Sequence, residues 1–256
     1  MSAAATPIAP ENGLVSQIVR GVRGSLRDLA QYLLNSQKGA DRDVEHKMYA
    51  LATEESARYA LQHMATATPI HAKKYAGQGR FDLLEHALSL VTVPGFHAEF
   101  GVYKGETLTF IAQRIGEVVY GFDSFEGLPD DWFLGVRKGH FGLNGEAPPL
   151  AIMQNNFRLV KGMFSDSVPM FTSQIEDKAA FVHIDCALYS SAKTVLEGLL
   201  DRLVPGTVIV FDRYFNYPSW QQHGFGAFQE FCVTHGVKYR YAAFAPEQFS
   251  VAIVIA

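Results

Sequence analysis

The sequence predicts an α/β fold: a doubly wound, Rossmann-like, seven-stranded sheet with the last strand antiparallel, preceded by an N-terminal helical extension. From Pro94 onward, segments of strand character alternate with segments of helical character. The strands are almost continuously apolar, as in Val208–Phe211, which is typical of a parallel sheet covered on both faces. Only a few residues, Phe244–Glu247 among them, separate the last two strands. This connection is too short for a crossover helix, so the final strand is expected to run antiparallel.

The pattern of apolar residues places the strands and helices of this sheet. Strands are expected at His97–Phe100, Val118–Phe122, Phe157–Val160, Phe181–Ile184, Thr207–Phe211, Tyr239–Ala243 and Ser250–Ile255. Helices are expected at Thr107–Ile115, Ser167–Gln174, Ser191–Arg202 and Gly226–His235.

Residues 1–92 are expected to form a separate extension of the domain at 93–256. A flexible tail over residues 1–12 is followed by three segments with helical spacing of apolar residues: Gly13–Gln37, Asp43–Met64 and Phe81–Val91. We expect these helices to cover an active site or to form the contact of a homodimer.

Composition narrows the class of protein. The chain has 256 residues, 48% hydrophobic and 19% charged, which is typical of an ordinary globular protein. Its net charge of −4 gives no basic face for nucleic acid or an anionic membrane, so neither is expected as a partner. Two cysteines, Cys186 and Cys232, make no disulfide framework. With no signal peptide and no apolar run long enough to span a bilayer, a cytoplasmic protein is expected.

The most informative motif is Glu99–Gly105, which ends one strand, and Asp123, which ends the next. Together they indicate a βαβ unit with an acid placed to bind a ribose. The spacing Glu-x-Gly-x-x-x-Gly differs from the dinucleotide fingerprint, and Glu99 stands where a phosphate would come close. A ligand without phosphate is therefore favoured, and S-adenosylmethionine fits. A nicotinamide dehydrogenase is the weakest alternative.

Further polar residues follow the other strands, at the edge where doubly wound folds bind ligands. They are Gly162, Asp185 and Asp212. The long connection Ser124–Asn155 is expected to act as a lid or binding loop, because segments of this length without regular structure are rare in compact domains. It carries aromatic residues and His140.

Four segments resemble the macrocin O-methyltransferase family, a group of class I S-adenosylmethionine-dependent enzymes known mainly for methylating sugar hydroxyls on antibiotics. They are Glu99–Gly105, Asp123–Pro129, His183–Ser191 and Val208–Tyr214. The resemblance runs from about residue 95 to the C-terminus. It implies a methyltransferase fold, S-adenosyl-L-methionine as cofactor and a small hydroxylated acceptor.

The resemblance also implies roles for individual residues. Gly101 and Gly105 would let the backbone approach the methionine half of the cofactor, Asp123 would accept hydrogen bonds from both ribose hydroxyls, and Phe125 would border the adenine. Asp185 would contact the cofactor amine or a metal. The full set of implied cofactor-binding residues is Glu99, Phe100, Gly101, Tyr103, Gly105, Asp123, Ser124, Gly162, Phe164 and Asp185.

The family pattern also includes acids that bind Mg²⁺ beside the substrate hydroxyls. Asp185 and Asp212 are present, but Ala187 and Arg213 stand where related sequences often have acids. Alanine offers no ligand, and the charge of an arginine opposes metal binding. Two readings stay open: Asp185 and Asp212 hold a metal with help from water, or Arg213 substitutes for the metal electrostatically.

An alcohol must lose its proton during methyl transfer, and the candidate bases are His140, Asp185 and Asp212. Alternation along the strand is taken to turn His183 away from Asp185, which makes it a packed, hydrogen-bonded histidine. Aromatic residues after the fifth strand are expected either to stack on a substrate ring or to pack in the core: Tyr214, Phe215, Tyr217 and Trp220.

The sequence thus predicts an S-adenosylmethionine-dependent O-methyltransferase acting on a sugar or secondary metabolite. The alternatives are methyl transfer to nitrogen or carbon on the same fold, and a cofactor-binding protein that has lost catalysis.

Overall fold

The computed structural model describes residues 42–71, 79–149 and 156–256. The chain divides into two compact units, Met1–Met48 and Tyr49–Ala256. A helix runs over residues 42–63, close to the predicted Asp43–Met64 segment, and its first turns fall in the first unit. The predicted tail and the predicted helix Gly13–Gln37 lie outside the described residues.

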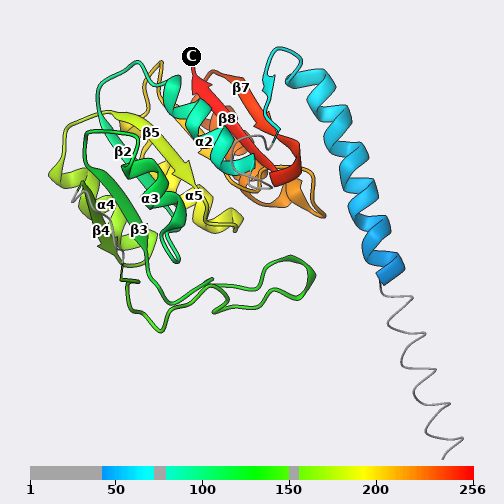
Figure 1. Cartoon of the computed structure of the whole chain (residues 1–256), viewed down its shortest axis with the longest axis horizontal. Coiled ribbons are helices and arrows are strands. Elements are labelled where there is room, and N and C mark those ends of the chain that lie inside the picture. Colours follow the sequence, from blue (N-terminus) through cyan, green and yellow to red (C-terminus); the bar gives the residue numbers. More distant parts are fainter. Residues whose placement is uncertain (1–41, 72–78, 150–155) are drawn as a thin grey trace, which may run out of the picture. The chain divides into compact units, whose positions relative to one another are not determined.

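The second unit is built on a sheet of eight strands in the order β1-β7-β8-β6-β5-β2-β3-β4 (Figure 1). The strands are β1 (Thr68–Pro69), β2 (Phe96–Phe100), β3 (Val119–Asp123), β4 (Phe157–Lys161), β5 (Ala179–Ile184), β6 (Val208–Phe211), β7 (Tyr239–Ala245) and β8 (Ser250–Ile255). All pairings are parallel except those of β8 with β6 and β7. The predicted doubly wound sheet with a reversed last strand is confirmed. The two-residue β1, which pairs with β7, is an addition to the seven predicted strands.

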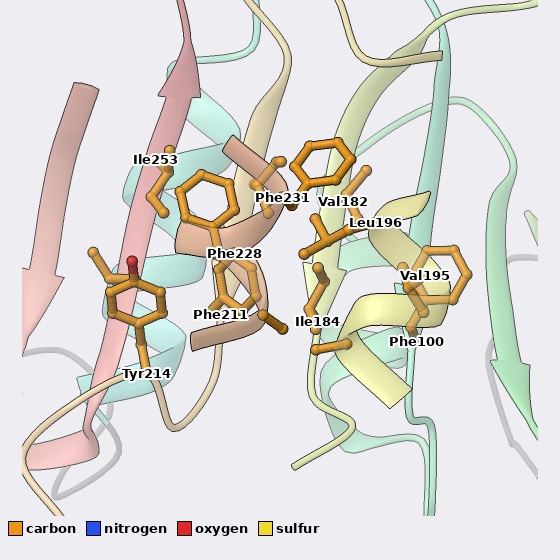
Figure 2. Packing of buried hydrophobic residues seen from close by; sticks show 14 of the residues in the cluster. Phe100, Val182, Ile184, Val195, Leu196, Phe211, Tyr214, Phe228, Phe231 and Ile253 are labelled. Atoms are coloured by element: carbon orange, nitrogen blue, oxygen red, sulfur yellow. The ribbon is translucent and has the colours of Figure 1, made fainter. Parts of the chain in front are cut away.

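Helices cover both faces of this sheet. They are α2 (Gly79–Ser89), α3 (Glu106–Ala112), α4 (Phe164–Gln174), α5 (Tyr189–Gly198) and α6 (Gly224–His235). Strand β6 shows why two cores form: Ile209 and Phe211 belong to one buried cluster, and Val208 and Val210 belong to the other. Because alternate side chains of a strand face opposite sides, each face of a continuously apolar strand needs its own layer of helices. Figure 2 shows the first cluster, in which Phe211 packs on Phe228 of α6. Their ring centroids lie 5.4 Å apart.

Helix α2 packs on the sheet and is not part of a separate extension. Its Leu83 and Leu84 are fully buried in the same cluster as Val208 and Val210. The boundary between the two compact units lies after Met48, whereas the sequence predicted a boundary after residue 92. The apolar face of α2 is used for packing on β7 and β8, so this helix does not have that face free for a lid or a dimer.

Within the second unit, hydrogen bonds join Ser56 and Tyr59 of the helix over residues 42–63 to β7 and to the loop after β6. The Tyr59 hydroxyl lies 2.6 Å from that of Tyr241 in β7, which lies 2.8 Å from that of Tyr214. The Asn216 backbone N–H donates to Ser56 Oγ at 2.8 Å. Across the described part of the chain, no helix has both the length and the apolar character needed to cross a bilayer.

Candidate active site

A cavity of about 310 Å³ lies at the carboxyl ends of the parallel strands. Loops after five strands contribute to its wall, which is where doubly wound folds bind ligands. The lining residues that follow these strands are Gly101, Val102, Tyr103, Lys104 and Gly105 after β2; Asp123, Ser124, Gly127, Leu128 and Pro129 at or after β3; Gly162, Met163 and Phe164 after β4; Asp185, Cys186, Ala187 and Ser191 after β5; and Arg213 after β6.

The backbone adopts left-handed conformations where several strands open into this cavity. Tyr103, Ala187 and Arg213 have φ values of 47°, 60° and 58°. Residues other than glycine rarely adopt such φ angles, and those that do cluster at functional sites. The three residues share a cavity, which marks it as the functional site of the fold.

Gly101 is required by a close approach between two of these loops. Its φ is +98°, and a Cβ atom there would lie 2.2 Å from the carbonyl oxygen of Asp185. The Asp185 N–H donates to the Phe100 carbonyl at 2.9 Å, which fixes the two loops against each other. Gly101 thus serves the packing of the cavity wall, in addition to any approach of the backbone to a ligand.

We expect Gly101→Ala to lower the free energy of unfolding by about 2 kcal/mol or more, because the strained φ and the backbone clash add. Denaturant unfolding of the variant checks this. Gly116→Ala is the control, since a Cβ at Gly116 meets nothing within 4 Å. Equal stability of the two variants would contradict the tight approach.

Asp123 is already engaged in holding the turn after β2. Its Oδ2 accepts the N–H groups of Val102 and Tyr103, both at 2.8 Å, and its Oδ1 accepts the Phe125 N–H at 2.7 Å. A carboxylate has about four acceptor positions, so capacity for one further hydrogen bond remains on Oδ1. Asp123 lines the cavity. Only the free acceptor position on Oδ1 is left for a ribose hydroxyl, so the two oxygens cannot each accept one. Phe125 itself is buried and lies outside the cavity wall.

Glu99 does not line the cavity. The side chain is fully buried and accepts hydrogen bonds from Thr107 Oγ1 and pairs with His183 Nδ1, each at 3.0 Å. Phe100, also predicted to bind the cofactor, is fully buried and stacks on Phe122 at 4.5 Å. Both residues belong to the strand itself, where side chains enter the core, so neither is placed to touch a ligand in the cavity.

His183 is a packed, hydrogen-bonded histidine, as predicted, but the reasoning about its direction was wrong. A strand repeats every two residues, so residues 183 and 185 share a side, and Asp185 contributes to the electrostatics of His183. Burial acts to lower the pKa of His183, but the hydrogen bond and charge of Glu99, together with the charges of Asp185 and Asp212, outweigh it. The pKa is therefore raised.

This raised pKa predicts a dependence of stability on pH. A histidine with a raised pKa in the fold stabilises it fully below the unfolded pKa, and loses that contribution as the pH rises through the folded value. The stability advantage of the wild type over Glu99→Gln should thus be largest in mild acid and shrink as the pH rises. Urea unfolding across this range measures it, with the exposed Glu176→Gln as control. A constant difference would contradict the charged pair.

Asp185 and Asp212 follow neighbouring strands and meet at Arg213. Arg213 Nη1 donates to Asp185 Oδ1 at 3.0 Å and lies 3.8 Å from Asp212 Oδ2. Asp212 is buried outside the cavity wall and accepts a hydrogen bond from Ser250 Oγ, whereas Asp185 lines the cavity. Burial, followed by the charge of Asp212, raises the pKa of Asp185 to about 7, with Arg213 opposing the rise.

These residues do not fit a divalent metal. A hard cation needs several oxygen ligands, and the described residues contain no group of three or more His, Cys, Asp or Glu side chains that could hold one. The two predicted ligands, Asp185 and Asp212, instead surround the guanidinium of Arg213. A second cation between them would face the charge of that arginine.

The remaining predicted residues divide between the cavity wall, the surface and the core. Of the other implied cofactor residues, Gly105, Tyr103, Ser124, Gly162 and Phe164 line the cavity. The predicted base His140 is exposed and lies outside the wall, although Phe141 beside it is part of the wall. The aromatic cluster after β6 packs in the core, since all of its members are at most 3% exposed: Tyr214, Phe215, Tyr217 and Trp220.

The connection after β3 is described over residues 124–149, where it folds back on itself (Figure 1). The Leu128 N–H donates to the His140 carbonyl at 2.9 Å, and the Gly139 N–H donates to the Leu128 carbonyl at 2.8 Å. Its Trp132 and Phe141 rings lie 5.5 and 5.9 Å from the Arg213 guanidinium. This segment therefore forms one wall of the cavity, as expected of a binding loop.

Sequence reasoning missed several residues of the wall: Arg80, Lys104, Glu106, Cys186 and Ser191. Arg80 begins α2, which precedes the sheet in sequence, and its guanidinium reaches Glu106 Oε2 at 3.2 Å. No motif marks Arg80, because only the packing of α2 on the sheet brings it to this edge.

Residues 98–214 match the family model described as a methyltransferase domain. Over these residues the chain is similar to methyltransferase domains, and its strand order is that of the class I methyltransferase fold. Among solved structures it is similar to the calicheamicin methyltransferase CalS11, with a TM-score of 0.59 and 23% identity over 71% of this chain and 80% of that one. It is also similar to the O-methyltransferase NovP, with a TM-score of 0.51 and 19% identity over 68% of this chain and 78% of the other.

A curated relative is the 8-demethyl-8-(2,3-dimethoxy-alpha-L-rhamnosyl)-tetracenomycin-C 4'-O-methyltransferase of Streptomyces olivaceus. It is 29% identical over 170 residues, which amount to 57% of this chain and 64% of the relative. The chain therefore spans less than two thirds of the length of that relative. The predicted methyltransferase class is confirmed at the level of the domain and its fold.

Proposed function

We propose that this protein is an S-adenosylmethionine-dependent O-methyltransferase that methylates a hydroxyl group on a sugar or on another small secondary metabolite. The observation that carries the proposal is the cavity at the strand ends, with Asp185 and Arg213 in its wall. The sugar class is supported by the tetracenomycin relative, whose name describes transfer to a hydroxyl of a rhamnosyl group.

The residues around the cavity suit such a cofactor. At the turn after β2, the backbone of Gly101 and Tyr103 lines the cavity and is open to a ligand. Asp123 keeps one acceptor position for a ribose hydroxyl. Gly162 and Phe164 offer a small and an apolar surface for the adenine. The turn after β2 has the spacing Glu-x-Gly-x-x-x-Gly, which differs from the glycine-rich fingerprint that binds a pyrophosphate.

These residues would hold S-adenosylmethionine, which would supply an electrophilic methyl group on a sulfonium for transfer to an acceptor oxygen. The chain must orient the acceptor and take its hydroxyl proton. Asp185 lines the cavity and has a pKa near neutrality, so its carboxylate serves as the base. Arg213, within hydrogen-bond distance of that carboxylate, holds it in place.

Calorimetric titration with S-adenosylhomocysteine tests the cofactor assignment. Saturable binding at one site supports the proposal, and no binding would overturn it. Incubation with S-adenosylmethionine and a panel of rhamnosylated and other hydroxylated acceptors then tests the reaction, with the methylated atom identified by mass spectrometry and NMR. Methyl transfer to nitrogen or carbon would replace the O-methyltransferase assignment. Tight binding without turnover on any acceptor would favour a protein that has lost catalysis.

A further inference from the structure

Two arginine side chains converge on one carboxylate oxygen at the rim of the cavity. The Nη1 atoms of Arg80 and Arg213 each lie 3.8 Å from Asp212 Oδ2, and they come from α2 and from the loop after β6. Arg213 Nη1 also donates to Asp185. Both arginines line the cavity. The two guanidinium groups therefore lie beside Asp185 and Asp212, whose negative charges would otherwise repel each other.

We propose that Arg80 and Arg213 together take the place of a divalent cation at this centre, so that the protein transfers its methyl group without a metal. This inference rests on the proposed function. The two guanidinium groups carry the charge of one divalent ion and pair with the carboxylates of Asp185, Asp212 and Glu106. A guanidinium group keeps its positive charge in proteins.

Contacts hold each guanidinium in place. Arg213 lies against the rings of Trp132 and Phe141, and its main chain has a φ of 58°. Arg80 Nη2 donates to Glu106 Oε2 at 3.2 Å, and its guanidinium lies 5.0 Å from the Phe81 ring. Cation–π contacts of this kind favour a fixed position over a mobile one.

The chemical consequence concerns the oxygen of the acceptor. Each guanidinium has five N–H donors, more than the contacts to Asp185, Asp212 and Glu106 use. The remaining donors of a guanidinium in the wall can bind the acceptor oxygen as negative charge develops on it. Fixed donors aimed at developing charge are typically worth about 10²–10³-fold in turnover.

The first test needs no acceptor. Wild-type protein, with and without S-adenosylhomocysteine, is titrated with Mn²⁺ and followed by electron paramagnetic resonance. We expect no saturable Mn²⁺ site that depends on Asp212. A saturable site in the wild type that is lost in Asp212→Asn would overturn the proposal.

The second test uses turnover on an acceptor found under the proposed function. Wild-type turnover is expected to be unchanged by EDTA and by added Mg²⁺. We expect Arg213→Ala to lower kcat by roughly 100-fold, and guanidinium ion in solution to restore part of it where Mg²⁺ does not. Loss of wild-type turnover in EDTA with recovery in Mg²⁺, or rescue of the variant by Mg²⁺ alone, would overturn the proposal.

Controls separate this inference from the proposed function. Arg58→Met removes an exposed arginine whose side chain pairs with Glu54, and it should leave kcat unchanged. Binding of S-adenosylhomocysteine by Arg213→Ala shows that the variant is folded. Failure of the wild type to bind S-adenosylhomocysteine contradicts the proposed function. Binding and turnover that depend on a metal contradict only the role of the arginines.

Discussion

Asp185→Asn is expected to lower kcat by about 10²–10⁴-fold, the usual contribution of a general base. The amide keeps the size of the side chain and an oxygen that can accept from Arg213 at the same place. It cannot take a proton from an acceptor hydroxyl. Calorimetric affinity for S-adenosylhomocysteine should change little, so steady-state turnover and binding measured together separate a lost base from a lost fold.

The wild-type pH profile adds an independent check on Asp185. Its pKa is raised to about 7, and only the carboxylate can accept a proton. Turnover should therefore rise with pH through neutrality and level off above it. In Arg213→Ala the rise should move to higher pH, because the charge of Arg213 opposes the raised pKa of Asp185 more than that of His183 does.

His140→Asn is the matched control for the base. His140 is exposed and lies outside the cavity wall, so its replacement should leave both kcat and the pH profile unchanged. A large loss of turnover in His140→Asn, with full activity in Asp185→Asn, would assign the proton transfer to the loop histidine.

The sheet could be predicted because its signals are local. The four residues between β7 and β8 forbid a crossover, and the structure pairs these strands antiparallel. The runs of apolar residues located every strand of the alternating part. Strand β1 could not be predicted, since two residues carry no periodicity and Thr68–Pro69 pairs only because β7 lies beside it. The role of α2 was missed for a similar reason, because its helical pattern does not say which partner its apolar face meets.

Residues that follow a strand were easier to predict than residues within one or far from one. Asp123 and Asp185 end up in the cavity wall because the ends of parallel strands share an edge of the sheet. Glu99 is one step inside β2, and the sequence did not show that Thr107 and His183 would hold it in the core. Arg80 carries no signal at all, because its approach to Asp212 depends on tertiary packing.

Asp123→Ala should weaken binding of S-adenosylhomocysteine by about 2–4 kcal/mol, roughly 30- to 1000-fold, because hydrogen bonds to a charged acceptor are worth more than neutral ones. The loss has two sources. One acceptor position for the ribose disappears, and the N–H groups of Val102, Tyr103 and Phe125 lose the oxygen atoms that hold the turn. The sequence alone suggested only the first source.

Two further variants separate these sources. Asp123→Asn keeps one acceptor oxygen but places donor hydrogens against backbone donors, so its affinity should lie between those of the wild type and Asp123→Ala. Asp131→Ala removes an exposed carboxylate that also accepts a backbone N–H, from Lys138 at 2.8 Å, but lies outside the cavity wall. It should bind S-adenosylhomocysteine like the wild type. If Asp123→Ala also binds like the wild type in calorimetry, the turn after β2 does not hold the cofactor. The residues around Arg213 would then be the next candidates for binding the ligand of the cavity.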